Sequence, residues 1–168
     1  MASDTLALRS LTHLRSGQVD QALRDARLLM RRMQGVRPFN FSAFMAYNAA
    51  AEVMVMAAVR EPRLAVSDQE LHRAIKLSAA YARIFPVGRS RPLLWRGMLR
   101  ARQGRTESAL AEIRKAAEAA RSQGMLLDEA RALYELGRLG AEGTEEAEAI
   151  TAHSQAMGVA RTHGGAAP

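Results

Sequence analysis

The 168-residue sequence contains no cysteine, which excludes a disulfide scaffold, a cysteine-based zinc finger and a thiol nucleophile. Aromatic side chains make up 5% of the residues, too few for the stacking platforms that hold single-stranded nucleic acid. Glycine and proline are also sparse, with 12 and 5 copies, whereas alanine, leucine, arginine and glutamate are abundant. This composition predicts an all-α protein with a packed core.

The start of the chain lacks a basic segment followed by an apolar one, so we expect no secretion signal and a cytoplasmic location. The longest apolar stretch, residues 43–59, contains Asn48 and Glu52, and we interpret it as too short and too polar to span a membrane. At this length one domain is the default. We expect it to cover residues 1–160, followed by a disordered tail at residues 161–168.

Acidic residues are scarce over most of the chain. Residues 1–125 carry 21 basic and 10 acidic side chains, whereas residues 126–168 carry 3 and 7, giving a formal net charge of +7. Such a basic body attracts nucleic acid or an acidic protein, so a basic helical nucleic-acid-binding protein is one alternative. Solvated arginine faces on ordinary helices explain the same charge without any partner.

Helix start and stop signals predict eight helices in four hairpins, or 42 residues per hairpin. Ser67 and Glu70 form a capping box, and Pro86 ends the helix that this box begins. Ser90 and Thr106 are predicted N-caps. The predicted helices cover residues 4–16, 19–34, 41–60, 67–85, 91–103, 106–122, 126–139 and 145–158.

Short and branched side chains recur at fixed spacings. At a shift of 40 residues, four positions repeat: Leu93, Gly97, Ala109 and Ala116 recur as Leu133, Gly137, Ala149 and Ala156. At a shift of 87, seven positions of the first segment are identical in the third, namely Leu6, Arg9, Arg15, Gly17, Ala22, Leu23 and Arg27. Ala109 and Ala116 lie two turns apart on one helix face, opposite Gly97, so two helix axes can approach to about 8–10 Å. One such hairpin cannot bury both its faces, so it must stack on another.

These positions resemble tetratricopeptide repeats, with a large residue, a Leu-Gly pair, a glycine at the turn and two alanines on the second helix. The fourth unit fits through Leu133, Leu136, Gly137, Ala149 and Ala156; the third through Leu93, Gly97, Gly104, Ala109 and Ala116; the first through Leu6, Gly17 and Ala22. The stretches around residues 81–104 and 122–139 are similar to the C-terminal helical arrays of large bacterial signalling proteins that contain ATPase, nucleotide-cyclase or kinase domains. The chain departs from the pattern at Arg9 and Arg96, where the family usually keeps a buried leucine, and at Arg100, where it usually has an aromatic residue.

The resemblance implies a right-handed α-solenoid with a non-catalytic role in protein interaction or scaffolding. The chain would form the regulatory or sensor part of a bacterial signalling assembly. A peptide, a helix or a partner domain would dock on its concave face. We expect a protein or peptide partner, including an acidic one, or further domains of a larger parent chain.

Two groups of residues are candidates for partner binding. If the repeat phase holds, the groove side carries an arginine row with Tyr134 among its members: Arg91, Arg102, Arg131 and Arg138. Guanidinium groups bind carboxylates in a bidentate way, which suits an acidic peptide, although solvated decoration is the alternative. Asn48 and Glu52 lie four residues apart on an otherwise apolar helix, either facing a ligand or forming an internal ion pair.

No pattern for metal binding or catalysis accompanies these groups. His13, His72, His153 and His163 are widely separated, and neither a zinc-protease helix nor a phosphate-binding loop is present in the sequence. We therefore expect no metal, no cofactor and no enzymatic activity. An enzyme with a site between helices, built on Asn48 and Glu52, remains the less favoured alternative.

Overall fold

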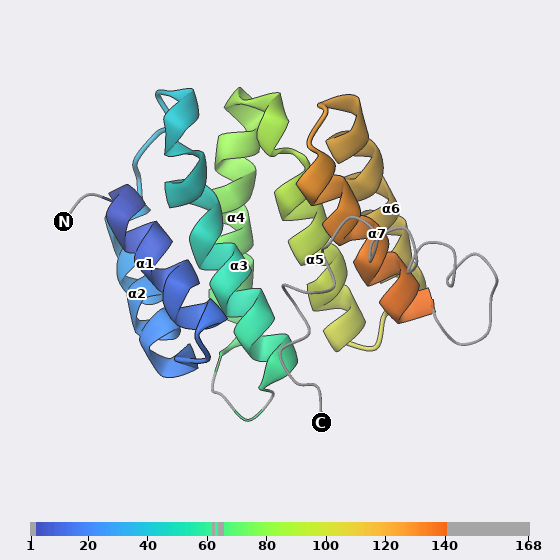
Figure 1. Cartoon of the computed structure of the whole chain (residues 1–168), viewed down its shortest axis with the longest axis horizontal. Coiled ribbons are helices and arrows are strands. Elements are labelled where there is room, and N and C mark those ends of the chain that lie inside the picture. The colour runs from blue at the N-terminus through green and yellow to red at the C-terminus, as the bar shows by residue number, and fades with distance from the viewer. Residues whose placement is uncertain (1–2, 62, 64–65, 141–168) are drawn as a thin grey trace. The chain divides into compact units, whose positions relative to one another are not determined.

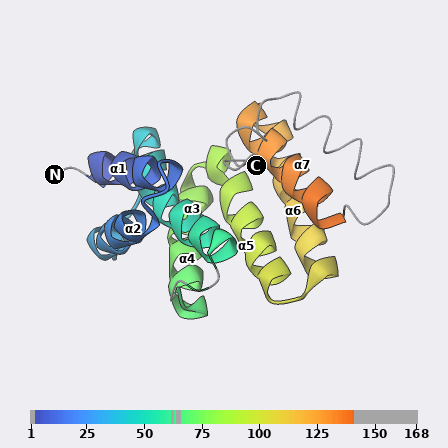
Figure 2. The same ribbon diagram turned by 60° about the horizontal axis from the view of Figure 1, so that its bottom comes forward.

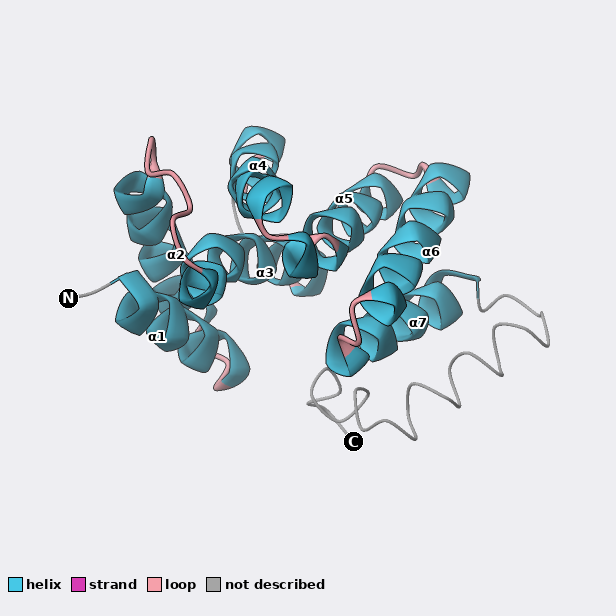
Figure 3. Cartoon of the chain, turned by 90° about the horizontal axis from the view of Figure 1, so that it is seen from above, coloured by secondary structure: helices cyan, strands magenta, loops and turns pink. Residues whose placement is uncertain are grey.

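The computed structural model describes residues 3–61, 63 and 66–140, and over these residues the chain is helical with no strand (Figures 1 and 3). The chain divides into two compact units, residues 1–88 and residues 89–168. Each unit is described by itself. The predicted all-α class is therefore confirmed for the described residues, and the solenoid arrangement stays a prediction.

The first unit contains four α-helices and two short 3₁₀ segments. They are α1 (Ser3–Arg15), α2 (Val19–Met33), η1 (Phe41–Ala43), α3 (Phe44–Arg60), α4 (Asp68–Ile84) and η2 (Pro86–Gly88). The described part of the second unit contains α5 (Ser90–Arg102), α6 (Thr106–Ser122) and α7 (Leu126–Gly140). The predicted eighth helix at residues 145–158 and the predicted tail at residues 161–168 lie outside the described residues, so neither is tested.

Helix α3 is the centre of the first unit and packs against α1, α2 and α4 (Figure 2). All thirteen residues from Ala46 to Ala58 are buried, as expected for a helix that is apolar almost all round. Counted from Phe41 to Arg60, this segment is long and apolar enough to cross a membrane, in contrast to the expectation from residues 43–59. The core helix of a globular unit meets the same criterion, and most of this segment is buried against its neighbours.

The predicted capping box at the start of α4 is confirmed. The Ser67 hydroxyl accepts a hydrogen bond from the Glu70 backbone amide, and the Glu70 carboxylate accepts one from the Ser67 backbone amide. The chain leaves the helix at Phe85, directly before Pro86, as predicted. Two other predicted caps are wrong by one residue, because Ser90 and Thr106 are the first helical residues and neither caps its helix.

The predicted hairpin turns are confirmed where the chain must adopt a left-handed backbone. Gly17 has a φ angle of 77° between α1 and α2, and Gly104 has a φ angle of 75° between α5 and α6. A side chain would be strained in this conformation, so glycine is favoured at both turns.

In the second unit α6 packs against both α5 and α7. The close approach predicted for Gly97 is confirmed, because a Cβ atom added there would lie 2.4 Å from Ile113 Cγ1 and 3.1 Å from the Ala109 carbonyl oxygen. Ala109 and Ala116 are completely buried. Trp95, the one tryptophan of the sequence, lies on α5 and is 1% exposed.

Candidate functional site

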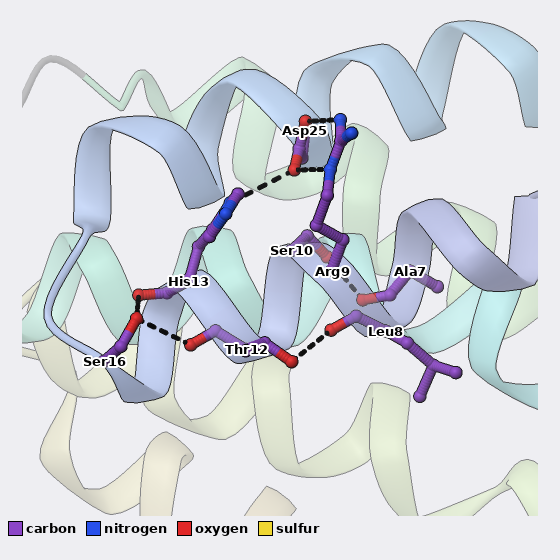
Figure 4. A network of polar contacts seen from close by, with 8 residues as sticks. All are labelled: Ala7, Leu8, Arg9, Ser10, Thr12, His13, Ser16 and Asp25. Carbon is purple, nitrogen blue, oxygen red and sulfur yellow. Dashed lines mark hydrogen bonds and ion pairs between the residues drawn. The ribbon is translucent and has the colours of Figure 1, made fainter. Parts of the chain in front are cut away.

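In the first hairpin, Arg9 and His13 of α1 lie against the Asp25 carboxylate of α2 (Figure 4). Arg9 Nε donates a hydrogen bond to Asp25 Oδ2 at 2.7 Å, and Arg9 Nη2 donates one to Oδ1 at 2.5 Å. His13 Nδ1 lies 3.2 Å from Asp25 Oδ2. The Arg9 guanidinium, with a smaller contribution from His13, holds the pKa of the buried Asp25 carboxyl below its ordinary value.

The α5–α6 hairpin carries a similar arrangement at the equivalent positions of the third predicted repeat, at the shift of 87 residues. Arg96 Nε lies 3.1 Å from Glu112 Oε2, and Arg100 Nη1 lies 3.2 Å from Glu112 Oε1. Glu112 is only 8% exposed, whereas both arginines are on the outer side of α5 with more than a third of their side chains exposed. We call each set of two basic side chains on the first helix and one acid on the second helix a clasp.

The clasps give a physical role to the arginines at which the sequence departs from the predicted tetratricopeptide pattern. A buried carboxylate on the second helix is stabilised by charged partners, and a leucine in place of Arg9 or Arg96 would remove one of them. Sequence reasoning missed the clasps because Asp25 and Glu112 differ in residue type and are not among the seven identities. Their common shift of 87 and common charge were the available signal.

Two members of the predicted arginine row lie inside the second unit. Arg91 is 8% exposed, and its Nε donates a hydrogen bond to Asp128 Oδ2 on α7 at 2.8 Å. Its Nη2 lies 2.6 Å from Asp128 Oδ1, and the Ser90 hydroxyl donates a hydrogen bond to Oδ2 at 2.9 Å. Arg131, one turn beyond Asp128 on α7, is 5% exposed. The Arg91 guanidinium therefore links α5 to α7, and Arg131 is buried within the second unit.

The other members of the row lie elsewhere. Arg138 binds Glu135 one turn before it on α7, with Nε donating at 2.8 Å, and its side chain is 40% exposed. Tyr134 is half-buried, and Arg102 is exposed at the end of α5. The structure thus does not gather the four arginines on one exposed surface, and partner binding by any of these residues stays a prediction.

The predicted polar pair of α3 is buried. Asn48 Nδ2 donates a hydrogen bond to the Phe44 carbonyl oxygen at 2.7 Å, and Asn48 Oδ1 accepts one from the Ser78 hydroxyl of α4 at 2.5 Å. Glu52, one turn further along, is 6% exposed. For Asn48 the internal interpretation is the better one, since its amide is hydrogen-bonded within the α3–α4 packing.

A groove of about 1060 Å³ lies in the first unit, between α2, the loop at residues 34–38 and α4. Its apolar lining comes from all three segments: Met30, Met33, Val36, Pro38, Leu77, Ala80 and Ile84. At one end Arg27 of α2 binds Glu70 of α4, with Nε donating to Oε1 at 2.7 Å. This contact and the capping hydrogen bond from Ser67 hold the pKa of the Glu70 carboxyl below its ordinary value.

Five further cations surround the groove: Arg31, Arg37, Arg73, Lys76 and Arg83. Within the part of the chain that the structure describes, none of these five side chains makes a hydrogen bond or an ion pair. Large apolar side chains are exposed on this loop, directly after it and at the end of α4, with Val36 at 43%, Phe39 at 79% and Ile84 at 52% exposure. Sequence reasoning missed this groove, because no motif marks the surface where the faces of two separate helices meet.

The groove combines an apolar floor with a surplus of positive charge, so it is suited to holding an amphipathic anion rather than to moving protons or ligating metal. Among the described residues no cluster of three or more potential metal ligands occurs. No protein-family model matches the sequence, and neither a curated protein nor a solved structure is significantly similar to it.

Proposed function

We propose that the chain is a non-catalytic protein-interaction module built from tetratricopeptide-like hairpins, serving as the regulatory or sensor part of a bacterial signalling assembly. The groove of the first unit is the observation that carries the interaction role. When a complementary partner covers an apolar surface bordered by cations without a partner among the described residues, the free energy of the system falls, because apolar area leaves water.

The hairpins support the tetratricopeptide-like part of the proposal. Two hairpins share a left-handed glycine at the turn and a clasp, all at the same shift of 87 residues. The contact of Gly97 with the second helix of its hairpin is the close approach that the repeat pattern requires. These equivalent positions with similar contacts support the proposal that the two hairpins are copies of one repeat.

The experiment is capture followed by reconstitution. The full chain is immobilised, the retained proteins are identified, and each one is purified and titrated against the free chain by calorimetry. We expect at least one of them to bind saturably with a defined stoichiometry and a negative heat-capacity change, the mark of apolar burial.

A matched pair of variants tests the predicted arginine surface in the same assay. Arg102→Glu reverses an exposed member of the predicted row, and Arg114→Glu reverses an exposed arginine of α6 outside it. Selective weakening by Arg102→Glu supports the row. If no captured protein binds once purified, the interaction role is refuted.

A further inference from the structure

We infer that the groove between α2 and α4 binds an acidic amphipathic helix of a partner protein, about four turns long. This inference rests on the proposed function and names the site and the kind of partner. It places binding on surfaces of α2 and α4, whereas the sequence prediction relied on α3, α5 and α7.

The length of the partner follows from the face of α4 that borders the groove. Five groove-lining residues of this helix recur every three or four positions, at Glu70, Arg73, Leu77, Ala80 and Ile84, and Lys76 and Arg83 lie next to two of them in the sequence. That spacing marks one continuous helix face, about 20 Å long at a rise of 1.5 Å per residue. A partner helix of about four turns matches this face along its whole length.

The partner's apolar face follows from the floor of the groove. Met30 and Met33 of α2 lie on one side, and Leu77 and Ala80 of α4 lie on the other. Methionine side chains are flexible and polarisable, so such a floor adapts to leucine, isoleucine or methionine side chains on the docking helix.

The partner's charge follows from the five cations around the groove. Glu70 is the single acidic residue of the lining, and Arg27 already binds it. Arg73, Lys76 and Arg83 therefore lie on the rim of α4 without a carboxylate partner among the described residues. Glutamate or aspartate on the flanks of the docking helix would complete these ion pairs, speed association and fix its orientation.

The same features argue against nucleic acid as the occupant. The lining contains no aromatic side chain on which a base could stack, and its centre is apolar where a phosphate backbone requires donors. An apolar floor between two basic rims fits a helix with one apolar face and two acidic flanks.

The test uses the full chain and a synthetic peptide of about 16 residues with leucine on one face and glutamate on both flanks, labelled with fluorescein. Binding is followed by fluorescence anisotropy. Two control peptides have glutamine in place of every glutamate, or two prolines that prevent a helix. We expect saturable binding of the acidic peptide and at least about tenfold weaker binding of both controls.

A matched pair of triple variants locates the site. Arg73→Glu, Lys76→Glu and Arg83→Glu together reverse the α4 rim, whereas Arg24→Glu, Arg105→Glu and Arg114→Glu reverse three exposed arginines outside the groove. All six side chains are exposed, so circular dichroism should report a folded protein in both cases. Because the two variants have the same net charge, only a specific site separates them. We expect the rim variant to bind at least about tenfold more weakly and the control to stay within about twofold of the native chain.

Leu77→Asp tests the floor separately from the rim. This half-buried side chain lines the groove, and its loss should weaken the acidic peptide although the basic rim is intact. Equal binding by the rim variant and its control would overturn the inference. The inference would also be overturned if an oligothymidine strand or phosphatidylserine vesicles displaced the peptide and bound both triple variants with equal affinity. That result would indicate a general attraction for polyanions.

Failure here is distinguishable from failure of the proposed function. A captured and purified partner that binds the rim variant and the native chain equally refutes the groove and leaves the interaction module standing. If the peptide binds as expected but no captured protein binds once purified, the groove is supported as a binding surface and the proposed role as an interaction module is refuted.

Discussion

The contact between Arg91 and Asp128 makes the sharpest prediction for the second unit. Both side chains are buried, and Asp128 accepts hydrogen bonds from the Arg91 guanidinium and the Ser90 hydroxyl. Arg91→Ala leaves a buried carboxylate on α7 without its cation, which should cost about 3–5 kcal/mol of the free energy of unfolding. If Arg91 were instead a partner-binding residue on a solvated surface, its loss would change stability by less than about 0.5 kcal/mol.

Trp95 provides a local assay for this prediction. It is the one tryptophan of the sequence and lies buried on α5, so its fluorescence during urea unfolding reports on the second unit. A double-mutant cycle with Arg91→Ala, Asp128→Ala and the double variant gives the coupling energy directly. We expect the double variant to lose less free energy of unfolding than the two single variants lose in sum, because it leaves neither buried charge without its partner. Additive effects, or a loss below about 1 kcal/mol for Arg91→Ala, would refute the buried pair.

Three further perturbations test the hairpins. Gly97→Ala should destabilise the second unit by about 1–3 kcal/mol, because the added Cβ would lie 2.4 Å from Ile113 Cγ1, and this overpacking outweighs the helix propensity of alanine; a rise in the urea midpoint would contradict it. Gly104→Ala should cost about 1–2 kcal/mol in the same assay, because its φ angle of 75° is left-handed, and an unchanged midpoint would argue against that turn. Arg9 lowers the pKa of Asp25 in the folded chain. When the pH is lowered through the ordinary carboxyl pKa of about 3.9, this carboxylate is therefore protonated in the unfolded chain before it is protonated in the folded chain, and the free energy of unfolding decreases as the pH decreases. Asp25→Asn should remove that part of the acid dependence in urea titrations by circular dichroism between pH 2 and pH 5, and a curve of unchanged slope would refute the contribution.

The sequence predicted the helices well because their ends depend on local chemistry. Ser67 and Glu70 cap α4 through groups only three residues apart, and Pro86 restricts the residue directly before it. Gly17 and Gly104 were recognisable for the same reason. The N-cap prediction at Ser90 failed because α5 begins one residue earlier, with Arg89 at the N-cap position, and the Ser90 hydroxyl donates to Asp128 on α7.

The candidate site was less predictable because burial of a charged side chain depends on which helices meet. Arg91 and Arg102 belong to the same short helix, and their positions in the sequence do not distinguish the buried one from the exposed one. Asn48 was different, since the apolar surroundings of its helix already favoured an internal partner, and Ser78 is one. The groove required knowledge of the contact of α2 and α4 with α3, which is tertiary information.

The net positive charge of the chain includes arginines that are paired with carboxylates and cations that are not, and the two groups have different expected roles. Arg9, Arg91, Arg96 and Arg100 bind buried carboxylates, so they stabilise packing between helices and contribute little free charge to a partner. The cations around the groove differ because their side chains border an apolar surface and bind no acid among the described residues. Reversal of a clasp arginine should therefore act mainly on stability, whereas reversal at the groove rim should act mainly on binding. A basic composition predicts a binding surface only where the cations are unpaired and adjacent to apolar area, and in this chain the groove of the first unit meets both conditions.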